Sequence, residues 1–251
     1  MKKTCAIKSL KRLAVIALFA PVAAFAATGV HLDKAPVSTD QKNLQSGARL
    51  FVNYCLNCHG ASAVRYNQLY KIGLDEKTIT DNLLFTGEKT GDLMTVAMAR
   101  EDAEAWFGTA PPDLSLIARA KASAAGSGAD YLYTYLRSFY RDPSRPTGWN
   151  NTVFANVGMP HALWDLQGVQ SLEETTDENG HEVQTFKLSQ SGTMSKETYD
   201  QAVADLVSFL VWMGEPDAGS RKTIGIFVLV FLAGLYVLTH KLGKNYWKDI
   251  H

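Results

Sequence analysis

The stretch Asn53–Gly60 reads NYCLNCHG and places Cys55 and Cys58 on either side of a two-residue gap, with His59 directly after them. Cys-X-X-Cys-His is the attachment pattern of a covalently bound haem c. In this pattern each thiol forms a thioether with one vinyl group of the porphyrin, and the next residue projects under the ring to ligate the iron. The sequence therefore predicts one haem c, held by Cys55 and Cys58, with His59 as an iron ligand.

Other uses of a Cys-X-X-Cys pair fit this sequence less well. A thioredoxin-type redox pair does not need the trailing histidine, and the residues before Cys55 do not resemble a thioredoxin strand. A zinc site would need further cysteines or histidines nearby, and none follows. A single disulfide in an exported domain is the remaining alternative, and His59 favours haem over it.

Residues 1–26 have the composition of a secretory signal. They contain five Lys or Arg and no acidic residue, then an apolar run, then the small-residue sequence Ala24-Phe25-Ala26. We expect cleavage after Ala26, which would remove Cys5 with the signal. The alternative is a membrane anchor, for which the apolar run is short. Export agrees with the motif, because haem c is attached outside the cytoplasm.

A second apolar run, from Thr223 to Thr239, contains no charged residue and is bracketed by Lys and Arg. It is long enough to cross a bilayer, and a buried core helix would explain the basic flanks poorly. We expect an exported domain over 27–220, a transmembrane helix over 221–240 and a short cytoplasmic tail over 241–251.

The whole chain has a formal net charge of zero, yet the expected exported domain is acidic. Residues 27–220 contain 15 Lys or Arg against 24 Asp or Glu, an excess of 9 negative charges. This balance argues against nucleic acid as a partner and favours a basic one. Two clusters stand out, although each could simply be a solvated face: Glu101, Asp102 and Glu104, and Glu173, Glu174, Asp177 and Glu178.

An electron-transfer haem needs a second axial ligand, and several side chains compete for that role. Met94 and Met98 are spaced as on a helix face, Met213 lies in an amphipathic pattern, and Met194 precedes an expected helix start. Met159 differs, because Gly158 and Pro160 place it on a loop. From the residues alone Met159 and the nearby His161 both stay open; methionine would raise the reduction potential.

The pattern of apolar residues predicts a mainly helical domain. We expect a helix over 40–56 with Gly47 on its apolar face, and a helix over 195–213 that packs against it there. Further expectations are an extended leading strand over 27–39, a helix over 131–140, and a break at Pro216. Alternating residues around Asn179-Gly180 predict a small β-hairpin within 169–188.

An ordered set of further motifs matches one family along nearly the whole chain. With these motifs, the sequence resembles cytochrome c1, the haem-bearing subunit of ubiquinol:cytochrome c oxidoreductase, of bacterial type. The shared features are the signal, CLNCH, 110–120 (APPDLSLIARA), Asp130-Tyr131, 157–160 (VGMP), 193–195 (TMS), 211–216 (VWMGEP) and the C-terminal anchor. The fold this implies is a c-type cytochrome domain with long loops and one C-terminal transmembrane helix.

The resemblance also implies roles for individual residues. Met159 would be the sixth iron ligand, and a backbone carbonyl near Pro111 would accept the second ring N–H of His59. Arg119 would pair with a haem propionate, and Tyr131 would lie beside the haem. The sequence Gly-Met-Pro-His departs from the Gly-Met-Ala-Pro-Pro of many family members, which keeps His161 as a minor rival.

The function that the resemblance implies is one-electron transfer, without a substrate-binding catalytic site in this subunit. Electrons would come from a Rieske iron–sulfur protein and pass to a basic soluble or membrane-bound c-type cytochrome. Cytochrome b would be a further partner, within a dimeric quinol–cytochrome c reductase. The haem domain would face the periplasm from the bacterial inner membrane. The alternatives are a cytochrome subunit of a terminal oxidase and a haem peroxidase with an open iron site.

Overall fold

The computed structural model describes residues 31–96, 98–176 and 182–248. The expected signal over 1–26 lies outside the described residues. So do Asp177, Glu178 and the Asn179-Gly180 turn, whose predicted places in an acidic cluster and a hairpin tip therefore stay predictions.

The described residues form a mainly helical domain with three small antiparallel sheets of two strands each, which confirms the predicted fold class. The helices are α2 (Gln41–Leu50), the π-helix η1 (Phe51–Cys55), the 3₁₀-helix η2 (Tyr66–Ile72), α3 (Glu76–Asn82), α4 (Arg100–Phe107), α5 (Ile117–Ala120), α6 (Gly128–Arg137), α7 (Trp164–Gln167), α8 (Lys196–Gly214) and α9 (Ala218–Tyr246). The strands are β1 (Ala61–Arg65), β2 (Leu93–Met94), β3 (Phe139–Arg141), β4 (Trp149–Asn151), β5 (Gly168–Thr176) and β6 (Glu182–Ser191).

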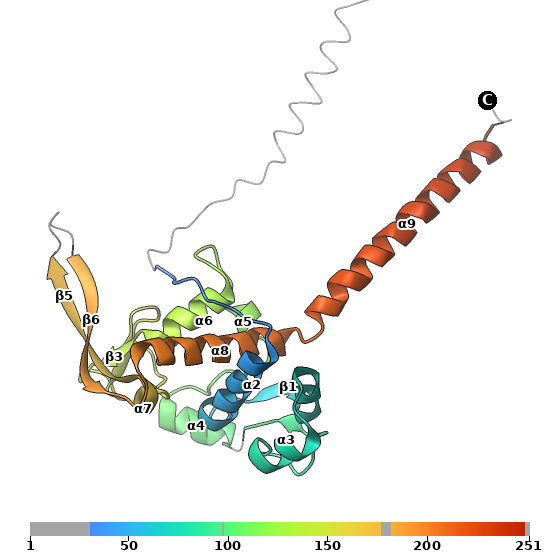
Figure 1. Ribbon diagram of the computed structural model, residues 1–251. Helices are drawn as coiled ribbons and strands as arrows, with labels where there is room; N and C mark the ends of the chain where they lie inside the picture. The colour runs from blue at the N-terminus through green and yellow to red at the C-terminus, as the bar shows by residue number, and fades with distance from the viewer. Residues whose placement is uncertain (1–30, 97, 177–181, 249–251) are drawn as a thin grey trace, which may run out of the picture.

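The crossing of α2 and α8 forms the centre of the core, as the sequence predicts (Figure 1). Gly47 lies at the crossing, where an added Cβ would sit 2.1 Å from the backbone oxygen of Asp205 and 2.7 Å from Cβ of Phe209. Phe51, one turn further along, packs its ring 5.6 Å from that of Phe209. Glycine is therefore required for the two backbones to come this close.

Replacing Gly47 by alanine should destabilise the protein by a net ~1–2 kcal/mol, because overpacking outweighs the better helix propensity of alanine. Denaturant unfolding of the full chain, followed by circular dichroism, would measure this loss. Gly219→Ala is the matched control, because no atom lies within 4 Å of the position its Cβ would take. Equal stabilities of the two variants would contradict the close crossing.

The helix that leads into the Cys-X-X-Cys-His motif changes its type before it ends. Asp40 caps α2 by accepting a hydrogen bond from the Lys42 N–H (2.8 Å). The chain then continues as the π-helix η1, which ends at Cys55. The predicted helix over 40–56 is thus one continuous coil, and periodicity alone does not reveal the wider last turn.

The predicted leading strand covers 27–39, of which 27–30 lie outside the described residues. The described residues 31–40 belong to no sheet, so this part of the prediction is wrong. Hydrogen bonds to helices fix this segment instead. The N–H of Asp33 donates to the hydroxyl of Thr134 (2.8 Å), and that of Ala35 donates to the carboxylate of Asp130 (2.8 Å). The N–H of Ser38 donates to the hydroxyl of Ser208 (2.9 Å). Side-chain acceptors on α6 and α8 thus replace a partner strand.

Asp130 joins this segment to the start of α6. Its burial acts to raise its pKa, but hydrogen bonds from Ala35 and from Ser127 prevail and lower the pKa to about 2. Because the folded pKa lies below the unfolded value of 3.8, the carboxylate stabilises the fold above pH 4. That stability is lost as the pH falls through 4 towards 2.

Replacing Asp130 by asparagine should therefore cost about 2 kcal/mol at neutral pH, and the difference from the wild type should shrink below pH 4. Unfolding measured across this pH range checks both statements. Asp81→Asn is the control, since Asp81 forms an exposed pair with Lys77 on α3 and exposed pairs contribute little. If Asp130→Asn stayed less stable than the wild type by the same free energy down to pH 2, the charge of the carboxylate would not be the cause of the difference.

The segment Tyr131–Tyr140 is helical as predicted up to Arg137, where α6 ends. Phe139 and Tyr140 belong to β3 instead, which pairs with β4 and so fixes the start of the loop before Met159. The spacing of the aromatic residues in 131–140 did not reveal β3, because its partner strand β4 begins ten residues later in the chain.

The predicted hairpin is confirmed for its two strands. β5 and β6 pair antiparallel from Gly168 opposite Ser191 to Thr176 opposite Glu182. Figure 1 shows this hairpin extending from the globular part at the end opposite to α9.

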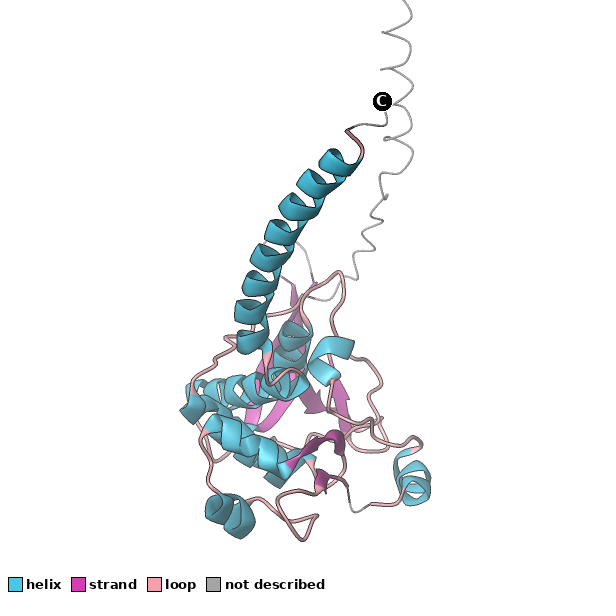
Figure 2. Ribbon diagram, turned by 90° about the vertical axis from the view of Figure 1, so that its right-hand side faces the viewer, coloured by secondary structure: helices cyan, strands magenta, loops and turns pink. Residues whose placement is uncertain are grey.

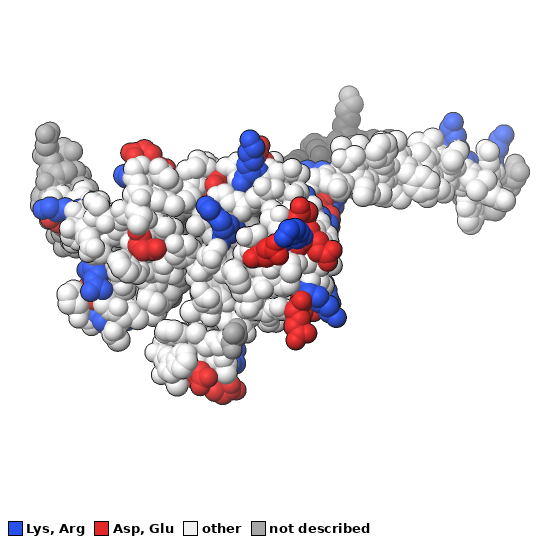
Figure 3. Space-filling view, turned by 60° about the horizontal axis from the view of Figure 1, so that its bottom comes forward, with Lys and Arg blue, Asp and Glu red and all other residues white. Residues whose placement is uncertain are grey.

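Pro216 separates α8 from α9, as predicted. α9 has 29 residues and a mean hydropathy of 2.1 over its most apolar window, and none of that window is buried. Figures 1 and 2 show it projecting alone from the globular domain. In Figure 3 its surface is uncharged along most of its length, with basic side chains near its end, whereas charges of both signs are interspersed over the domain. Length and composition therefore fit a membrane anchor.

Candidate haem site

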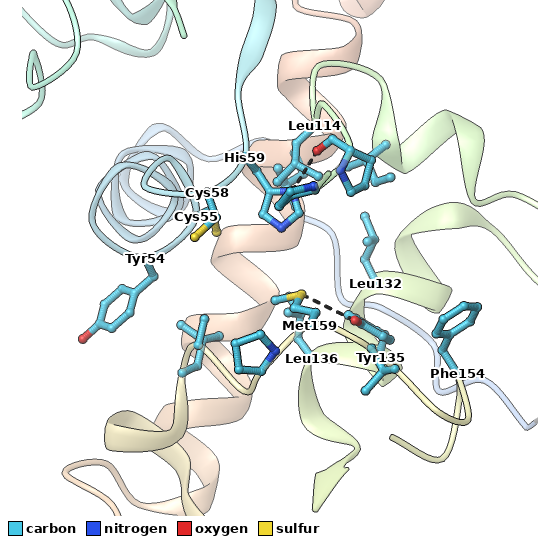
Figure 4. A pocket seen from close by; sticks show the side chains of 18 of the residues that line it. Tyr54, Cys55, Cys58, His59, Leu114, Leu132, Tyr135, Leu136, Phe154 and Met159 are labelled. Atoms are coloured by element: carbon cyan, nitrogen blue, oxygen red, sulfur yellow. Dashed lines mark hydrogen bonds between the residues drawn. The ribbon is translucent and has the colours of Figure 1, made fainter. Parts of the chain in front are cut away.

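One largely apolar cavity of about 340 Å³ brings the predicted site residues together. Its walls come from the Cys-X-X-Cys-His turn, the 109–117 segment, α6, the 154–163 loop and α8 (Figure 4). Of the residues the sequence singles out, those that line it are Cys55, Cys58, His59, Pro111, Tyr131 and Met159.

The motif residues are positioned by a tight turn at the end of η1. The carbonyl of Cys55 accepts hydrogen bonds from the N–H groups of Cys58 (3.1 Å) and His59 (2.8 Å). This turn brings both sulfur atoms and the imidazole to the wall of one cavity.

Cys55 and Cys58 are not joined by a disulfide. Burial, and to a smaller extent the neighbouring Cys58, raises the pKa of Cys55 to about 12; burial also raises the pKa of Cys58. Redox cysteines of the thioredoxin type depend on a lowered pKa, so these surroundings do not match that alternative.

His59 is oriented by the segment that follows Pro111. Its Nδ1–H donates to the carbonyl oxygen of Pro112 (2.7 Å), one residue beyond the Pro111 named from the sequence. Since that nitrogen carries the hydrogen, Nε2 keeps its lone pair for a metal. Burial lowers the pKa of His59, although the Pro112 bond and Asp113 oppose this shift, so the neutral form is favoured.

Asp113 fixes the Pro112 carbonyl beside the motif. Its carboxylate accepts from the N–H groups of Ser62 (2.7 Å) and Ser115 (2.8 Å), and the N–H of Leu114 donates to the carbonyl of Gly60 (2.8 Å). The proline segment is thus tied to the chain on both sides of His59.

Met159 lies across the cavity from His59, on an irregular loop (Figure 4). The loop is held at Asn156, which has a positive φ of 61°. The guanidinium of Arg145 donates to the side-chain and backbone oxygens of Asn156 (3.0 and 3.1 Å), and the N–H of Asn156 donates to Oδ1 of Asn150 (2.8 Å). Arg145 and Asn150 of β4 therefore fix the backbone of the loop at Asn156, three residues before Met159.

The other methionines of the described chain do not line this cavity. Met94 is fully buried in β2, opposite Ala61, so the helical face predicted for Met94 and Met98 is wrong. Met213 is buried in the α8 core, and Met194 packs against that core just before the Ser195 cap.

His161 does not line the cavity either. It is 2% exposed and stacks on the ring of Phe139 at 4.9 Å, with Trp149 edge-on at 5.2 Å. Its Nε2–H donates to Oε1 of Gln167 (2.6 Å). Burial lowers the pKa of His161 to about 4, despite the opposing effects of Gln167 and Asp165. His161 is therefore a neutral core residue next to the loop, which favours Met159 as the residue that faces His59.

Arg119 is not among the lining residues; it is exposed on α5, and its predicted pairing with a propionate stays a prediction. Lys121, which the sequence reasoning missed, does line the cavity. Its ammonium lies 5.0 Å from the centre of the Tyr131 ring and 5.8 Å from that of Phe154. A cation at this wall suits an anionic substituent of a ligand.

Tyr135 is a second residue that sequence reasoning missed. It follows Tyr131 by one helical turn, so both side chains lie on the same face of α6. Its hydroxyl donates to Sδ of Met159 at 3.4 Å (Figure 4). The sequence does contain a signal for Tyr135. It lies four residues after Tyr131, which was predicted to lie beside the haem, so a helix would place both tyrosines on the same face.

The donor set fits a haem c. Two thiols, an imidazole with a free Nε2 and a thioether meet around one apolar cavity, and a lysine stands at its wall. Thiols provide thioether attachment, imidazole and thioether are haem ligands, and the apolar walls suit a porphyrin. Fold and site together therefore define a c-type cytochrome domain with a C-terminal apolar helix.

Comparison with known proteins gives the family. The profile of the Cytochrome C1 family matches residues 31–250, and the chain belongs to this family. Cytochrome c1 of Allochromatium vinosum is 46% identical, over 95% of this chain and 98% of its own length. A Nitrosomonas europaea protein named ammonia monooxygenase gamma subunit is 51% identical, over 97% of this chain and 100% of its own length. Cytochrome c1 of Rhodospirillum rubrum is 28% identical, over 84% of this chain and 83% of its own length.

Family membership confirms the resemblance drawn from the motifs. The chain is a haem protein of respiratory electron transport, of the kind found as the haem subunit of the bc1 complex. The C-terminal apolar helix fits the membrane anchor of such a protein.

Proposed function

We propose that this chain is the one-electron carrier of a quinol–cytochrome c reductase, with one haem c bound through Cys55 and Cys58. The single observation that supports it most is the convergence of both thiols, His59 and Met159 on one apolar cavity. When bound, a haem c supplies reversible one-electron exchange without making bonds to a substrate.

Each side chain has a defined task in this proposal. Cys55 and Cys58 would hold the group covalently, and His59 and Met159 would be the side chains that ligate its iron. The carbonyl of Pro112 keeps His59 in one tautomer and orientation through the 2.7 Å bond. Leu206 and Leu210 of α8 and Leu132 and Leu136 of α6 exclude water from the cavity.

With His59 and Met159 as ligands on the two sides of the cavity, the iron would have no open position for a small substrate. This is why we favour an electron carrier over a peroxidase-like enzyme. Tyr131 and Lys121 at the wall would contact the edge of the group, and Arg119 would reach its carboxylates from α5.

The arrangement in the cell is part of the proposal. Residues 1–26 would be a signal, 27–220 an exported haem domain on the periplasmic side, 221–240 the span and 241–251 a cytoplasmic tail. The apolar α9 with its basic flanks supports a single span in the bacterial inner membrane. Within a dimeric complex, cytochrome b and a Rieske protein would be the neighbours, and the Rieske protein the electron donor.

A basic c-type cytochrome is the acceptor that the charges favour. Glu101 and Asp102 are exposed on α4, and the domain carries an excess of 9 negative charges. Part of this charge is neutralised locally, because Glu104 pairs with Arg100 (3.0 Å) and Glu173 with Lys187 (2.9 Å). The acidic surface that would attract a basic cytochrome is therefore smaller than the two acidic clusters of the sequence suggest.

Purification of the full chain from its native membrane in mild detergent tests this function. We expect cytochrome b and a Rieske protein to copurify, and the complex to reduce a basic c-type cytochrome at a rate that falls as salt rises. The Nitrosomonas europaea relative is named for a monooxygenase. Copurification with monooxygenase subunits, or with copper or haem oxidase subunits, would contradict the proposal.

A further inference from the structure

The hydroxyl of Tyr135 is aimed at the sulfur of Met159. The ring is held from two sides, stacked on Tyr131 with centres 5.8 Å apart and edge-on to Phe139 at 5.0 Å. Its hydroxyl then lies 3.4 Å from Sδ of Met159, within hydrogen-bonding range for sulfur. Packing thus fixes the direction of the O–H group.

Met159 and Tyr135 belong to one packed unit. Both contact the small buried cluster formed by Phe139, Trp149 and Val157. Val157 lies two residues before Met159. The same cluster therefore packs against both the loop and the ring of Tyr135. Packing on this shared cluster therefore holds the tyrosine ring and the Met159 side chain next to each other.

A thioether sulfur has two lone pairs. If one is used for a metal, the other remains available as a weak acceptor, and here the Tyr135 hydroxyl lies beside the sulfur. A hydrogen bond to that lone pair withdraws electron density from the sulfur and makes it a weaker donor. The ferric state needs ligand donation more than the ferrous state does, so a weaker donor raises the reduction potential.

We propose that Tyr135 tunes the reduction potential upward by donating a hydrogen bond to the Met159 sulfur. This inference rests on the proposed function, in which Met159 is an axial ligand. Tyr135 acts through the sulfur of Met159 and does not itself take part in electron transfer.

The test is Tyr135→Phe, which keeps the ring and its two aromatic contacts and removes the hydroxyl. We expect the ferrous form to become roughly three- to tenfold less favoured in redox titration of the full holoprotein, a fall of ~30 to ~60 mV at ~59 mV per tenfold. The thioether-to-iron charge-transfer band should remain, because the ligand is kept.

Tyr133→Phe is the matched control on the same helix. Its ring lies beneath the guanidinium of Arg137 at 4.3 Å, and Tyr133 does not line the cavity. We expect its potential to equal that of the wild type. An equal shift in both variants, or no shift in Tyr135→Phe, would overturn the role of the hydroxyl. Loss of the charge-transfer band in Tyr135→Phe would also overturn it, since the tyrosine would then hold the ligand in place instead of tuning it.

Replacing Tyr135 by 3-fluorotyrosine provides a second variant if the phenylalanine variant does not assemble. Fluorination makes the phenol a stronger donor, so the potential should rise; a fall would contradict the proposal. Failure of the proposed function gives a different result: Met159→Leu would then leave the spectrum unchanged. A Met159→Leu variant that loses its band, together with an unshifted Tyr135→Phe, would remove the tyrosine inference alone.

Discussion

Replacing Met159 by leucine is expected to abolish the thioether charge-transfer band and to lower the reduction potential by on the order of 0.1–0.3 V. Axial ligands set haem potentials over a range of ~0.8 V, and methionine lies at the high end because its thioether favours ferrous iron. Leucine nearly preserves the volume of the side chain, so the loop held by Arg145 and Asn150 should keep its fold. Optical spectra and a redox titration of the full chain in detergent measure both effects.

Met194→Leu is the control for this substitution, since Met194 packs against the α8 core and does not line the cavity. It should keep the wild-type spectrum and potential. If Met159→Leu also kept them, Met159 would not be a ligand. His161 would then need reconsideration, despite its buried position between Phe139 and Trp149.

Replacing both Cys55 and Cys58 by alanine is expected to abolish covalent haem attachment altogether. Each thiol provides one thioether, so each single variant should retain a single bond and show a shifted haemochrome spectrum. Haem staining after denaturing electrophoresis distinguishes covalent from dissociable haem. Loss of the cofactor should also destabilise the domain, because apolar surface of α6 and α8 would be exposed to water.

Asn57→Ala is the control for the cysteine variants, because it changes the motif but keeps both thiols. Asn57 is exposed between the two cysteines, and its side chain donates to the carbonyl of Asn53 (3.1 Å). This variant should stain as strongly as the wild type. Covalent haem in the double cysteine variant would contradict the assignment of the motif.

The features that the sequence predicts well are those encoded by nearby residues. The Cys-X-X-Cys-His turn, the strands that flank Asn179-Gly180 and the apolar helix after Pro216 are each set by a local pattern. The crossing at Gly47 was also predictable, because a glycine on an apolar helix face leaves room for a second backbone.

The features that the sequence misses depend on distant partners. Met94 lies in a strand because Ala61 pairs with it, and no helix-like spacing could reveal that pairing. The hydrogen bond between Tyr135 and Met159 joins residues 24 positions apart. The segment 31–40 joins no sheet because side-chain acceptors on α6 and α8 bind its N–H groups. Tertiary contacts of this kind override local propensity.

Peptide mapping of the purified chain by mass spectrometry tests the central claim most directly. Trypsin cuts after Arg49 and Arg65, so one peptide carries the whole motif. We predict that this peptide bears a single porphyrin joined to both Cys55 and Cys58. Recovery of the same peptide with two free thiols, or with a disulfide between them, would contradict the account.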